Sequence, residues 1–343
     1  MIKEAMLYNK LDGDKVQCNV CSRRCTIVPG KKGFCRVREN RGGTLYTLIY
    51  GTVSSEAIDP IEKKPLFHFY PGSLSYSLGT IGCNFRCRHC QNWTISQVGV
   101  DQIHSVEIMP EEAVARALES GSKSIAWTYN EPTIWYEYTY DCAKLAKEAG
   151  LATVYVTNGY ITPEALRKIS PYLDAFRVDI KAFTEEFYKD VCSAKLAPVL
   201  ESAVLAKELG MHVEVINLVI PTLNDSADEI RQLSKWVYDN LGADTPLHFT
   251  RFQPHYKMQD LPSTPVKTLE MAYDIAREEG MQYIYMGNVF GHEYESTFCH
   301  ACGNLLIKRG LFNVEKYNVT QEGACPDCGE VISIVGNYAD VHD

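Results

Sequence analysis

Apolar runs of strand length recur through the middle of the chain, and patterns with the period of a helix lie between most of them. The runs occupy residues 76–81, 124–129, 152–157, 175–180, 212–220, 246–252 and 283–289. Strands that alternate with helices form parallel pairs with right-handed crossovers. The pattern predicts an α/β fold, a partial (β/α)6-type open TIM barrel, with a doubly wound sheet as the alternative.

Signals for helix starts support this order of elements. Pro110 precedes two glutamates, Pro163 opens a second helical pattern, and residues 224–226 offer side chains that cap a third. Upstream, residues 44–50 and 65–72 predict a hairpin-like lead-in to the main domain.

These signals divide the chain into three predicted parts. Residues 1–72 form an N-terminal module with four cysteines and the β lead-in. Residues 73–292 form the partial barrel, and residues 293–343 form a C-terminal, zinc-ribbon-like module with four further cysteines.

Polar side chains collect where the predicted strands end. In a barrel these ends meet on one face, and that face carries the active site. The side chains are Cys83, Asn130, Glu131, Thr157, Asn158, Asp179, Lys181, Asn217, Arg251, His255 and Asn288. We expect them to face a common site, with His255 as a candidate contact to a nucleotide or substrate. The alternatives are a helix cap for Asn130 and Glu131, and a surface ion pair for Asp179 and Lys181.

Cys83, Cys87 and Cys90 follow the first of these strands with the spacing C-x3-C-x2-C. Three clustered thiolates can hold three irons of a cubane cluster and leave the fourth iron open for chemistry. The residues between them are mostly polar and basic, which favours metal-bound or reactive thiolates over inert core thiols.

Four more cysteines, Cys18, Cys21, Cys25 and Cys35, lie in one short segment near the N-terminus. The segment has few apolar residues and no helical period, so it needs a cross-link or a bound metal to hold its shape. We predict a metal site there, either zinc or a second iron-sulfur cluster.

The C-terminal module contains two C-x2-C-G knuckles, formed by Cys299 with Cys302 and by Cys325 with Cys328. Two knuckles make a closed four-thiolate site, for which zinc is the default metal and a structural role the usual one.

Two cysteines stand apart from these groups. Cys142 lies in an apolar helical pattern and is predicted to be a small buried hydrophobe. Cys192 follows the fourth strand and is either a packed thiol or a hydrogen-atom donor or substrate anchor at the mouth of the active site.

Composition narrows the class of protein. The chain has 343 residues with 13 cysteines, no export signal at its start and no apolar run long enough to span a membrane, so we expect a cytoplasmic protein whose thiols bind metals. A net charge of −9 argues against broad nucleic-acid binding.

The cysteine loop after the first strand, with strand-helix repeats behind it, resembles the radical S-adenosylmethionine (SAM) enzymes. In that family three cysteines bind a [4Fe–4S] cluster whose open iron is chelated by SAM, and the reduced cluster cleaves SAM to methionine and a 5′-deoxyadenosyl radical that abstracts hydrogen. The resemblance implies that Cys83, Cys87 and Cys90 ligate the cluster, that Phe85 shields it or faces the adenine, and that a low-potential donor supplies the electron.

Further stretches are similar to the glycyl-radical-enzyme (pyruvate formate-lyase) activating enzymes. Residues 129–132, Tyr-Asn-Glu-Pro, stand where those proteins carry a Gly-Gly-Glu-Pro motif that meets the amino group of SAM. Residues 156–159 and 179–181 resemble their third- and fourth-strand motifs, which implies that Lys181 binds the SAM carboxylate. The chain departs from the pattern in the two residues before the glutamate and at Ile216, where a polar or basic residue is usual.

Over nearly its whole length the chain most resembles the radical SAM component of the AmmeMemoRadiSam system. The resemblance rests on residues 18–21, 33–40, 129–138, 179–183 and 217–221 and on the terminal knuckles. It implies neighbours of the Memo and AMMECR families as possible partners.

Together these observations predict a radical SAM enzyme that abstracts hydrogen from a small molecule or lipid precursor. One alternative is an activase that installs a radical on a partner protein. A second alternative is a non-catalytic metal-binding or electron-transfer protein.

Overall fold

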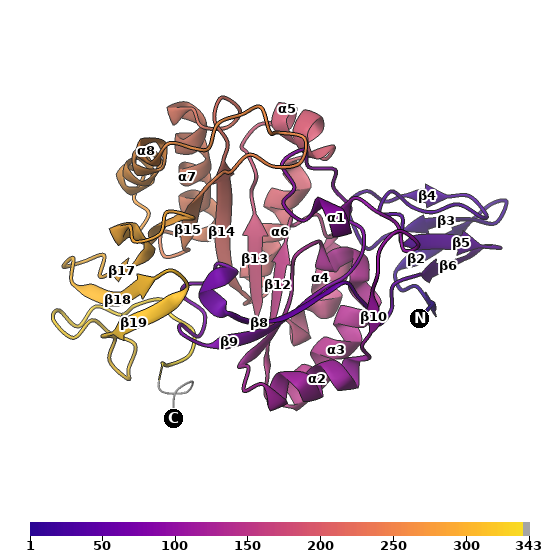
Figure 1. The fold of residues 1–343 in the computed structure, drawn as a ribbon, viewed down its shortest axis with the longest axis horizontal. Coiled ribbons are helices and arrows are strands. Elements are labelled where there is room, and N and C mark those ends of the chain that lie inside the picture. The colour runs from indigo at the N-terminus through magenta and orange to yellow at the C-terminus, as the bar shows by residue number, and fades with distance from the viewer. Residues whose placement is uncertain (339–343) are drawn as a thin grey trace.

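An eight-stranded sheet forms the centre of the molecule in the computed structural model, which describes residues 1–338 (Figure 1). Its strands are hydrogen-bonded in the order β8, β9, β11, β12, β13, β14, β15 and β16. Their bounds are Ser55–Pro60 for β8, Leu74–Gly79 for β9, Ser124–Trp127 for β11, Ala152–Thr157 for β12, Ala175–Asp179 for β13, His212–Val219 for β14, Leu247–Arg251 for β15 and Ile284–Gly287 for β16. Each of the last seven overlaps one of the apolar runs in the sequence, which confirms the predicted strands.

Strands β9 and β11 to β16 are parallel and follow one another in chain order, whereas β8 pairs antiparallel with β9 at one edge. Because every right-handed crossover advances in the same direction, the connecting helices lie on one face of the sheet. The order never reverses, so the sheet is not doubly wound. The α/β class is confirmed, with seven parallel strands where a (β/α)6 unit has six.

The helices that cover this face are α2 (Pro110–Glu119), α3 (Tyr136–Glu148), α4 (Pro163–Ile169), α6 (Ala197–Glu208), α7 (Ala227–Leu241) and α8 (Val266–Glu278). Their starts follow the sequence signals: Pro110 and Pro163 lie in the first turns of α2 and α4, and the Ser226 hydroxyl accepts a hydrogen bond from the Glu229 N–H to cap α7.

The predicted hairpin-like lead-in is wrong in its second half. Residues 65–72 form no strand, and the antiparallel partner of β9 is β8, which comes earlier. The physical reason lies in the backbone N–H groups of Phe67 and His68, which donate to the Glu214 carboxylate on β14 instead of to a neighbouring strand. Since β8 belongs to the central sheet, that sheet begins before the predicted boundary at residue 72.

Small antiparallel sheets stand at both ends of the long axis (Figure 1). At the N-terminal end, β1 (Lys3–Glu4), β6 (Thr44–Thr47) and β5 (Arg38–Arg41) form one sheet, and β2 (Tyr8–Leu11), β3 (Lys15–Cys18) and β4 (Thr26–Ile27) form another. At the other end lie β17 (Thr297–Phe298), β18 (Leu305–Gly310) and β19 (Asn313–Tyr317). The last five residues of the predicted C-terminal module lie outside the described residues.

The remaining described elements are short. They are strands β7 (Thr52–Val53) and β10 (Val106–Glu107), helices α1 (Trp93–Ser96) and α5 (Glu185–Phe187), the 3-10 turns η1 (Ile61–Lys63), η2 (Pro132–Trp135), η3 (Ser170–Tyr172) and η5 (Glu293–Glu295), and the π-turn η4 (Tyr188–Cys192). Across residues 1–338, no helix combines the length and the apolar character that crossing a bilayer requires.

A buried arginine joins the C-terminal strands to the central domain. Arg309 on β18 donates to the Phe67 carbonyl at 2.8 Å and to the Thr297 hydroxyl at 2.7 Å, and its Nε lies 3.6 Å from the Glu62 carboxylate on η1. The Arg309 and Glu62 side chains are almost completely buried, so each charge depends on the other.

We predict that Arg309→Met lowers the free energy of unfolding by about 3 to 5 kcal/mol, because it leaves the Glu62 carboxylate buried without its cation. Lys308→Ala is the matched control on the same strand. Lys308 pairs with Glu315 at the surface, so its loss costs less than about 1 kcal/mol. Urea unfolding of both variants measures the difference, and equal stabilities would contradict this interpretation of Arg309.

His68 predicts a pH dependence of stability. Its Nδ1 donates to the Ser333 carbonyl, which can only accept, so its Nε2 accepts from the Tyr285 hydroxyl. Burial lowers the pKa of His68 to about 3. Between that pKa and the ordinary value near 6.5, the unfolded chain binds a proton that the folded chain does not, so stability falls as the pH drops through this window. We expect His68→Gln to reduce the slope of the unfolding free energy between pH 6.5 and 4, with the remainder due in part to His89, whose pKa burial also lowers to about 3, whereas an unchanged slope would exclude a contribution from His68.

Candidate active site

The three cysteines of the C-x3-C-x2-C spacing lie in a loop, residues 83–90, that leaves the carboxyl end of β9. We call it the cluster loop. The π-turn η4 fixes its backbone, since the Cys192 carbonyl accepts from the Arg86 N–H at 2.9 Å and the Val191 carbonyl accepts from the Arg88 N–H at 3.0 Å. Cys192 is itself fully buried beneath the loop, which favours the packed thiol over an anchor at the mouth of the site.

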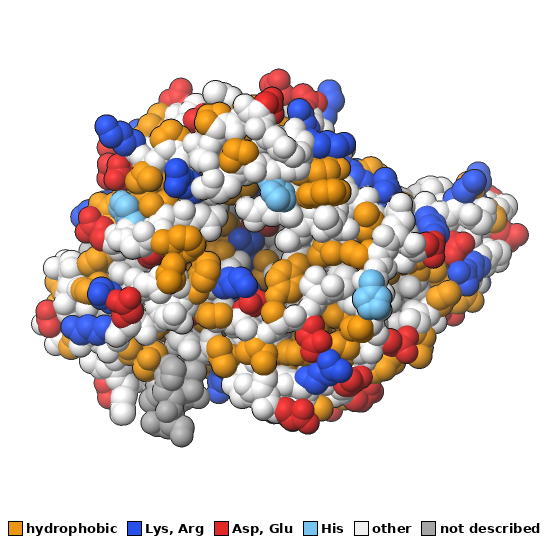
Figure 2. Space-filling view, viewed as in Figure 1, with side chains coloured by type: hydrophobic (Ala, Val, Ile, Leu, Met, Phe, Trp, Pro, Cys, Tyr) orange, Lys and Arg blue, Asp and Glu red, His pale blue; other side chains and the backbone are white. Residues whose placement is uncertain are grey.

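A cavity of about 560 Å³ opens beside this loop at the carboxyl ends of the parallel strands. The face in Figure 2 is hollowed at its centre, with basic side chains inside and hydrophobic side chains around it. The volume suits a nucleotide-sized cofactor together with a small substrate. Nine of the residues expected at the site line it: Cys83, Phe85, Cys87, Cys90, Asn130, Asn158, Asp179, Lys181 and Asn288.

Glu131 and Thr157 lie behind the cavity wall. The Glu131 carboxylate is completely buried and accepts hydrogen bonds from the Thr133 N–H, the Thr133 and Thr157 hydroxyls and the Asn158 N–H. Glu131 thus caps η2, which is the alternative interpretation of this residue, and it fixes the end of β12. Local hydrogen bonds occupy this carboxylate, and the cofactor contacts expected of Glu131 and Thr157 stay predictions.

Asn217 and His255 also lie outside the cavity lining. The Asn217 amide donates to the Ile180 carbonyl at 2.9 Å and so ties β14 to the end of β13. His255 lies in a separate surface hollow with Trp93 and Tyr256, whose rings stack at 5.0 Å. Their roles as cofactor contacts stay predictions.

The cluster-loop thiols fit an iron-sulfur cluster. Burial raises the pKa of Cys83, and the nearby Glu131 carboxylate raises it further, while burial also raises the pKa of Cys90. Thiolates at these positions therefore need a bound cation, which iron supplies. The Phe85 N–H points at the Cys83 sulfur from 3.3 Å, a contact of the kind that stabilises cluster thiolates.

A row of alternating charges runs along β13 into the cavity. Asp179 accepts from Arg177 at 2.6 Å and from Lys181 at 3.3 Å, and the three side chains share one face because they are two residues apart. Burial would lower the pKa of Lys181, but the Asp179 carboxylate outweighs burial and holds that pKa above its usual value. The ion pair of the alternative interpretation is present, with Lys181 16% and Asp179 27% exposed, and it lies in the wall of the cavity, while the role of Lys181 as a cofactor contact stays a prediction.

Sequence reasoning missed a second charged group, on the opposite wall. Asp59, at the end of β8, accepts from Lys63, Lys64 and the Tyr129 hydroxyl. Burial would raise the pKa of Asp59, but the two lysines hold it well below its usual range, and burial lowers the pKa of Lys64 to about 8. The sequence around these residues contains no motif that predicts a site. They reach the cavity because β8 pairs with β9, and this pairing cannot be seen in the sequence of β8 alone.

The far wall of the cavity comes from the C-terminal strands. Leu311 and Phe312, in the turn between β18 and β19, line it, and the Phe312 ring meets Phe290 at 5.8 Å. The C-terminal module therefore contributes directly to the shape of the site. Its cysteine spacing predicted a metal but gave no sign of this contact.

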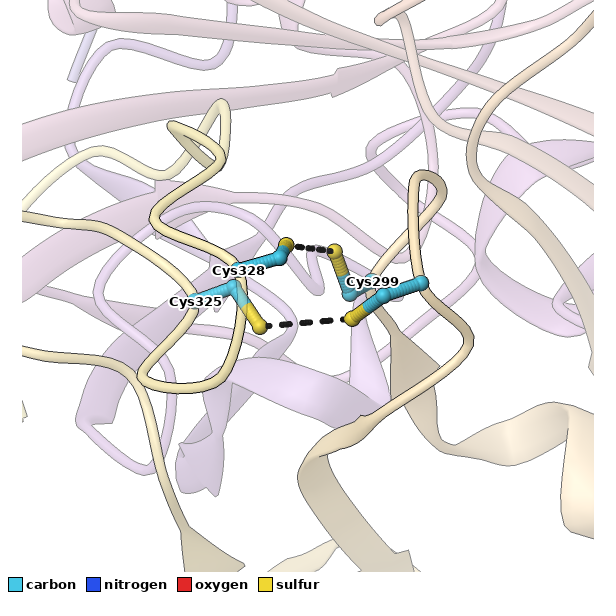
Figure 3. A group of neighbouring side chains, drawn as sticks. Cys299, Cys325 and Cys328 are labelled. Carbon is cyan, nitrogen blue, oxygen red and sulfur yellow. Dashed lines mark hydrogen bonds between the residues drawn. The ribbon is translucent and has the colours of Figure 1, made fainter.

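The four C-terminal cysteines face one another across two loops (Figure 3). The sulfurs of Cys299 and Cys328 are 3.6 Å apart and those of Cys302 and Cys325 are 3.7 Å apart. A tetrahedral zinc with Zn–S bonds near 2.3 Å places its thiolates about 3.8 Å apart, so the spacing fits zinc. Desolvation raises the pKa of Cys325, but backbone N–H groups of the knuckle and neighbouring thiols lower it to about 6, which favours the thiolate.

The comparisons with known proteins agree with this geometry. Residues 78–236 match the family described as the Radical SAM superfamily. An uncharacterized protein of Methanocaldococcus jannaschii is 52% identical over 335 residues, which cover 97% of this chain and 100% of that protein. The pyruvate formate-lyase-activating enzyme of Clostridium pasteurianum is 25% identical over 162 residues, 45% of this chain and 65% of that enzyme.

Among solved structures, Streptococcus suis SuiB bound to its precursor peptide SuiA superposes with a TM-score of 0.51 and 12% identity, covering 66% of this chain and 51% of that one. This likeness concerns the fold. The chain belongs to the radical SAM superfamily, whose members are enzymes that use a [4Fe–4S] cluster and SAM.

We predict that a Cys302→Ser, Cys328→Ser variant loses about one zinc per chain and unfolds at a lower temperature, since a structural four-cysteine site contributes folding energy. Asp327→Asn in the same knuckle is the matched control and keeps the metal. Elemental analysis with thermal unfolding measures both effects, and full zinc retention in the serine variant would contradict the assignment.

Proposed function

We propose that this enzyme cleaves SAM reductively and uses the resulting radical to abstract hydrogen from a small acidic molecule. The observation that carries the proposal is the cavity of about 560 Å³ that is lined by the buried Cys83 and Cys87, the half-buried Cys90 and the Asp179–Lys181 pair. When bound, the [4Fe–4S] cluster and SAM supply a 5′-deoxyadenosyl radical, with methionine as the other product.

The chain's own residues hold and orient these groups. Cys83, Cys87 and Cys90 would ligate three irons and leave the fourth without a protein ligand. Lys181, fixed by Asp179, would bind the carboxylate of SAM with a charge-assisted hydrogen bond. Phe85 packs against Tyr160 and Tyr188 and excludes water from that wall.

Arg177 points to the chemical class of the substrate. Its Nη1 donates to Asp179, but its buried Nε has no hydrogen-bond partner among the described residues. The Arg177 side chain lines the cavity, where a guanidinium suits a substrate that carries a carboxylate or phosphate group. Leu311 and Phe312 close the opposite side, which favours a compact substrate over an extended protein segment.

The activase alternative rests on the similarity to the pyruvate formate-lyase-activating enzyme. The presence of the chain's own C-terminal turn in the cavity wall argues against it. Partnership with Memo and AMMECR proteins stays a prediction. The partial TIM barrel also stays a prediction, and the pairing of the parallel strands in chain order supports it.

We expect protein reconstituted anaerobically with iron and sulfide, then reduced in the presence of SAM, to release 5′-deoxyadenosine. Incubation with deuterated carboxylated or phosphorylated metabolites should move deuterium into that product for the true substrate. An intact cluster that yields no 5′-deoxyadenosine would rule the proposal out and leave the non-catalytic alternative.

Lys181→Met should raise the KM for SAM at least tenfold with a smaller effect on kcat, because the fixed cation for the SAM carboxylate is lost. Lys189→Met, an exposed lysine on η4, is the matched control and should leave both constants unchanged. The measurement is 5′-deoxyadenosine formation at varied SAM, and equal KM values for the two variants would remove Lys181 from the site.

A further inference from the structure

The four N-terminal cysteines line one small cavity, separate from the active-site cavity. Cys18, Cys21, Cys25 and Cys35 all line a small cavity of about 20 Å³ between β3, β4 and the start of β5. The space is larger than a single water needs, and its other walls combine apolar residues with four polar ones, Arg23, Arg38, Asn84 and Thr133. We call it the N-terminal cysteine pocket.

The spacing of these sulfurs differs from that of the C-terminal group. Among the described residues, only the C-terminal cysteines bring three or more metal-binding atoms within 4.8 Å of one another. The N-terminal thiols are therefore spread more widely around their pocket than one zinc ion allows. In a cubane cluster each thiolate binds its own iron, so its sulfurs lie farther apart than in a site with one metal ion.

Two buried polar side chains that line the same pocket each have at least one donor atom without a hydrogen-bond partner among the described residues. The Arg38 side chain is 3% exposed and donates to Glu137 through Nη2, while its Nε and Nη1 have no hydrogen-bond partner among the described residues. The Asn84 Nδ2 is likewise buried and without a partner there. Unpaired buried donors beside four thiols fit an anionic group inside the pocket, because a cluster with four thiolates carries net negative charge.

The pocket lies directly against the cluster loop. Asn84 belongs to both, and Arg86 of the loop donates to the Phe34 carbonyl on one side and to the Cys83 carbonyl at 2.8 Å on the other. A Cβ at Gly82 would stand 2.7 Å from the Cys35 carbonyl, so the two backbones touch at a position that admits only glycine.

From this arrangement we propose that Cys18, Cys21, Cys25 and Cys35 bind a second [4Fe–4S] cluster, which passes electrons to the cluster held by Cys83, Cys87 and Cys90. One electron enters from an external low-potential one-electron donor, which is oxidised, and reduces the N-terminal cluster. The same electron then reduces the neighbouring cluster and restores the first to its oxidised state. No atom or proton is transferred. The site itself does not depend on the proposed function, whereas its use as a relay does.

Two matched variants test the site after anaerobic reconstitution. One replaces Cys83, Cys87 and Cys90 with serine, and the other replaces Cys18, Cys21 and Cys25 with serine. We expect about eight irons in the wild type and about four irons with four sulfides in each variant. The reduced cluster that remains in the first variant should give an electron paramagnetic resonance signal unchanged by SAM, and the one in the second should give a signal that SAM alters.

If the first variant binds no iron, the proposal of a second cluster is overturned, whether that variant holds one zinc ion per chain or two. Wild-type protein decides the question even where a variant fails to fold, since Mössbauer spectra should then show half of the iron insensitive to SAM. A total of about four irons, all of them responsive to SAM, would overturn it as well.

The relay has its own readout. Reduced flavodoxin serves as the donor probe, and freeze-quench spectroscopy follows the reduction. Flavodoxin should reduce the SAM-responsive cluster at least tenfold more slowly in the variant that lacks Cys18, Cys21 and Cys25 than in the wild type. Dithionite, a small reductant that needs no relay, should reduce both to the same extent. Equal rates with flavodoxin would overturn the relay while leaving the metal site, and a failure to form 5′-deoxyadenosine would bear only on the proposed function.

Discussion

Parallel pairing of consecutive strands is the constraint on which the rest of this structure depends. In the series β9 and β11 to β16 each strand adds to the same side of its predecessor, so the carboxyl ends of seven strands face one cavity. The pairing register determines which side chains face the cavity. In this register Asp179 stands opposite Ile216, and Thr157 stands opposite Val178. A one-residue slip of β13 would turn Arg177, Asp179 and Lys181 away from the cavity together.

Buried polar groups then hold the loops that leave these strand ends. Glu131 joins η2 to the end of β12 through hydrogen bonds to Thr133, Thr157 and Asn158. The backbone of η4 joins the cluster loop to the end of β13 in the same way. These groups are buried from solvent, and their hydrogen bonds hold in place the residues that line the cavity.

The three cysteine groups differ in geometry as well as in spacing. The C-terminal sulfurs converge to within 4.8 Å of one another, as one tetrahedral ion requires, while the other two groups border open space. The N-terminal module contacts the cluster loop through the hydrogen bond from Arg86 to the Phe34 carbonyl, and the C-terminal module lines the cavity with Leu311 and Phe312. Both terminal modules therefore pack against the elements that form the candidate site.

The sequence by itself determined the α/β class, the seven parallel strands and the three cysteine groups, because hydrophobic period and ligand spacing are local properties. It also placed Asp179 and Lys181 on one face, since a strand has a period of two. Only the tertiary structure decided that Glu131 is a cap and that Asp59, Lys64 and Phe312 complete the cavity. It also decided that backbone N–H groups of residues 65–72 donate to Glu214 instead of forming a strand. Those outcomes depend on contacts between segments far apart in the chain, and no pattern within either segment encodes its partner.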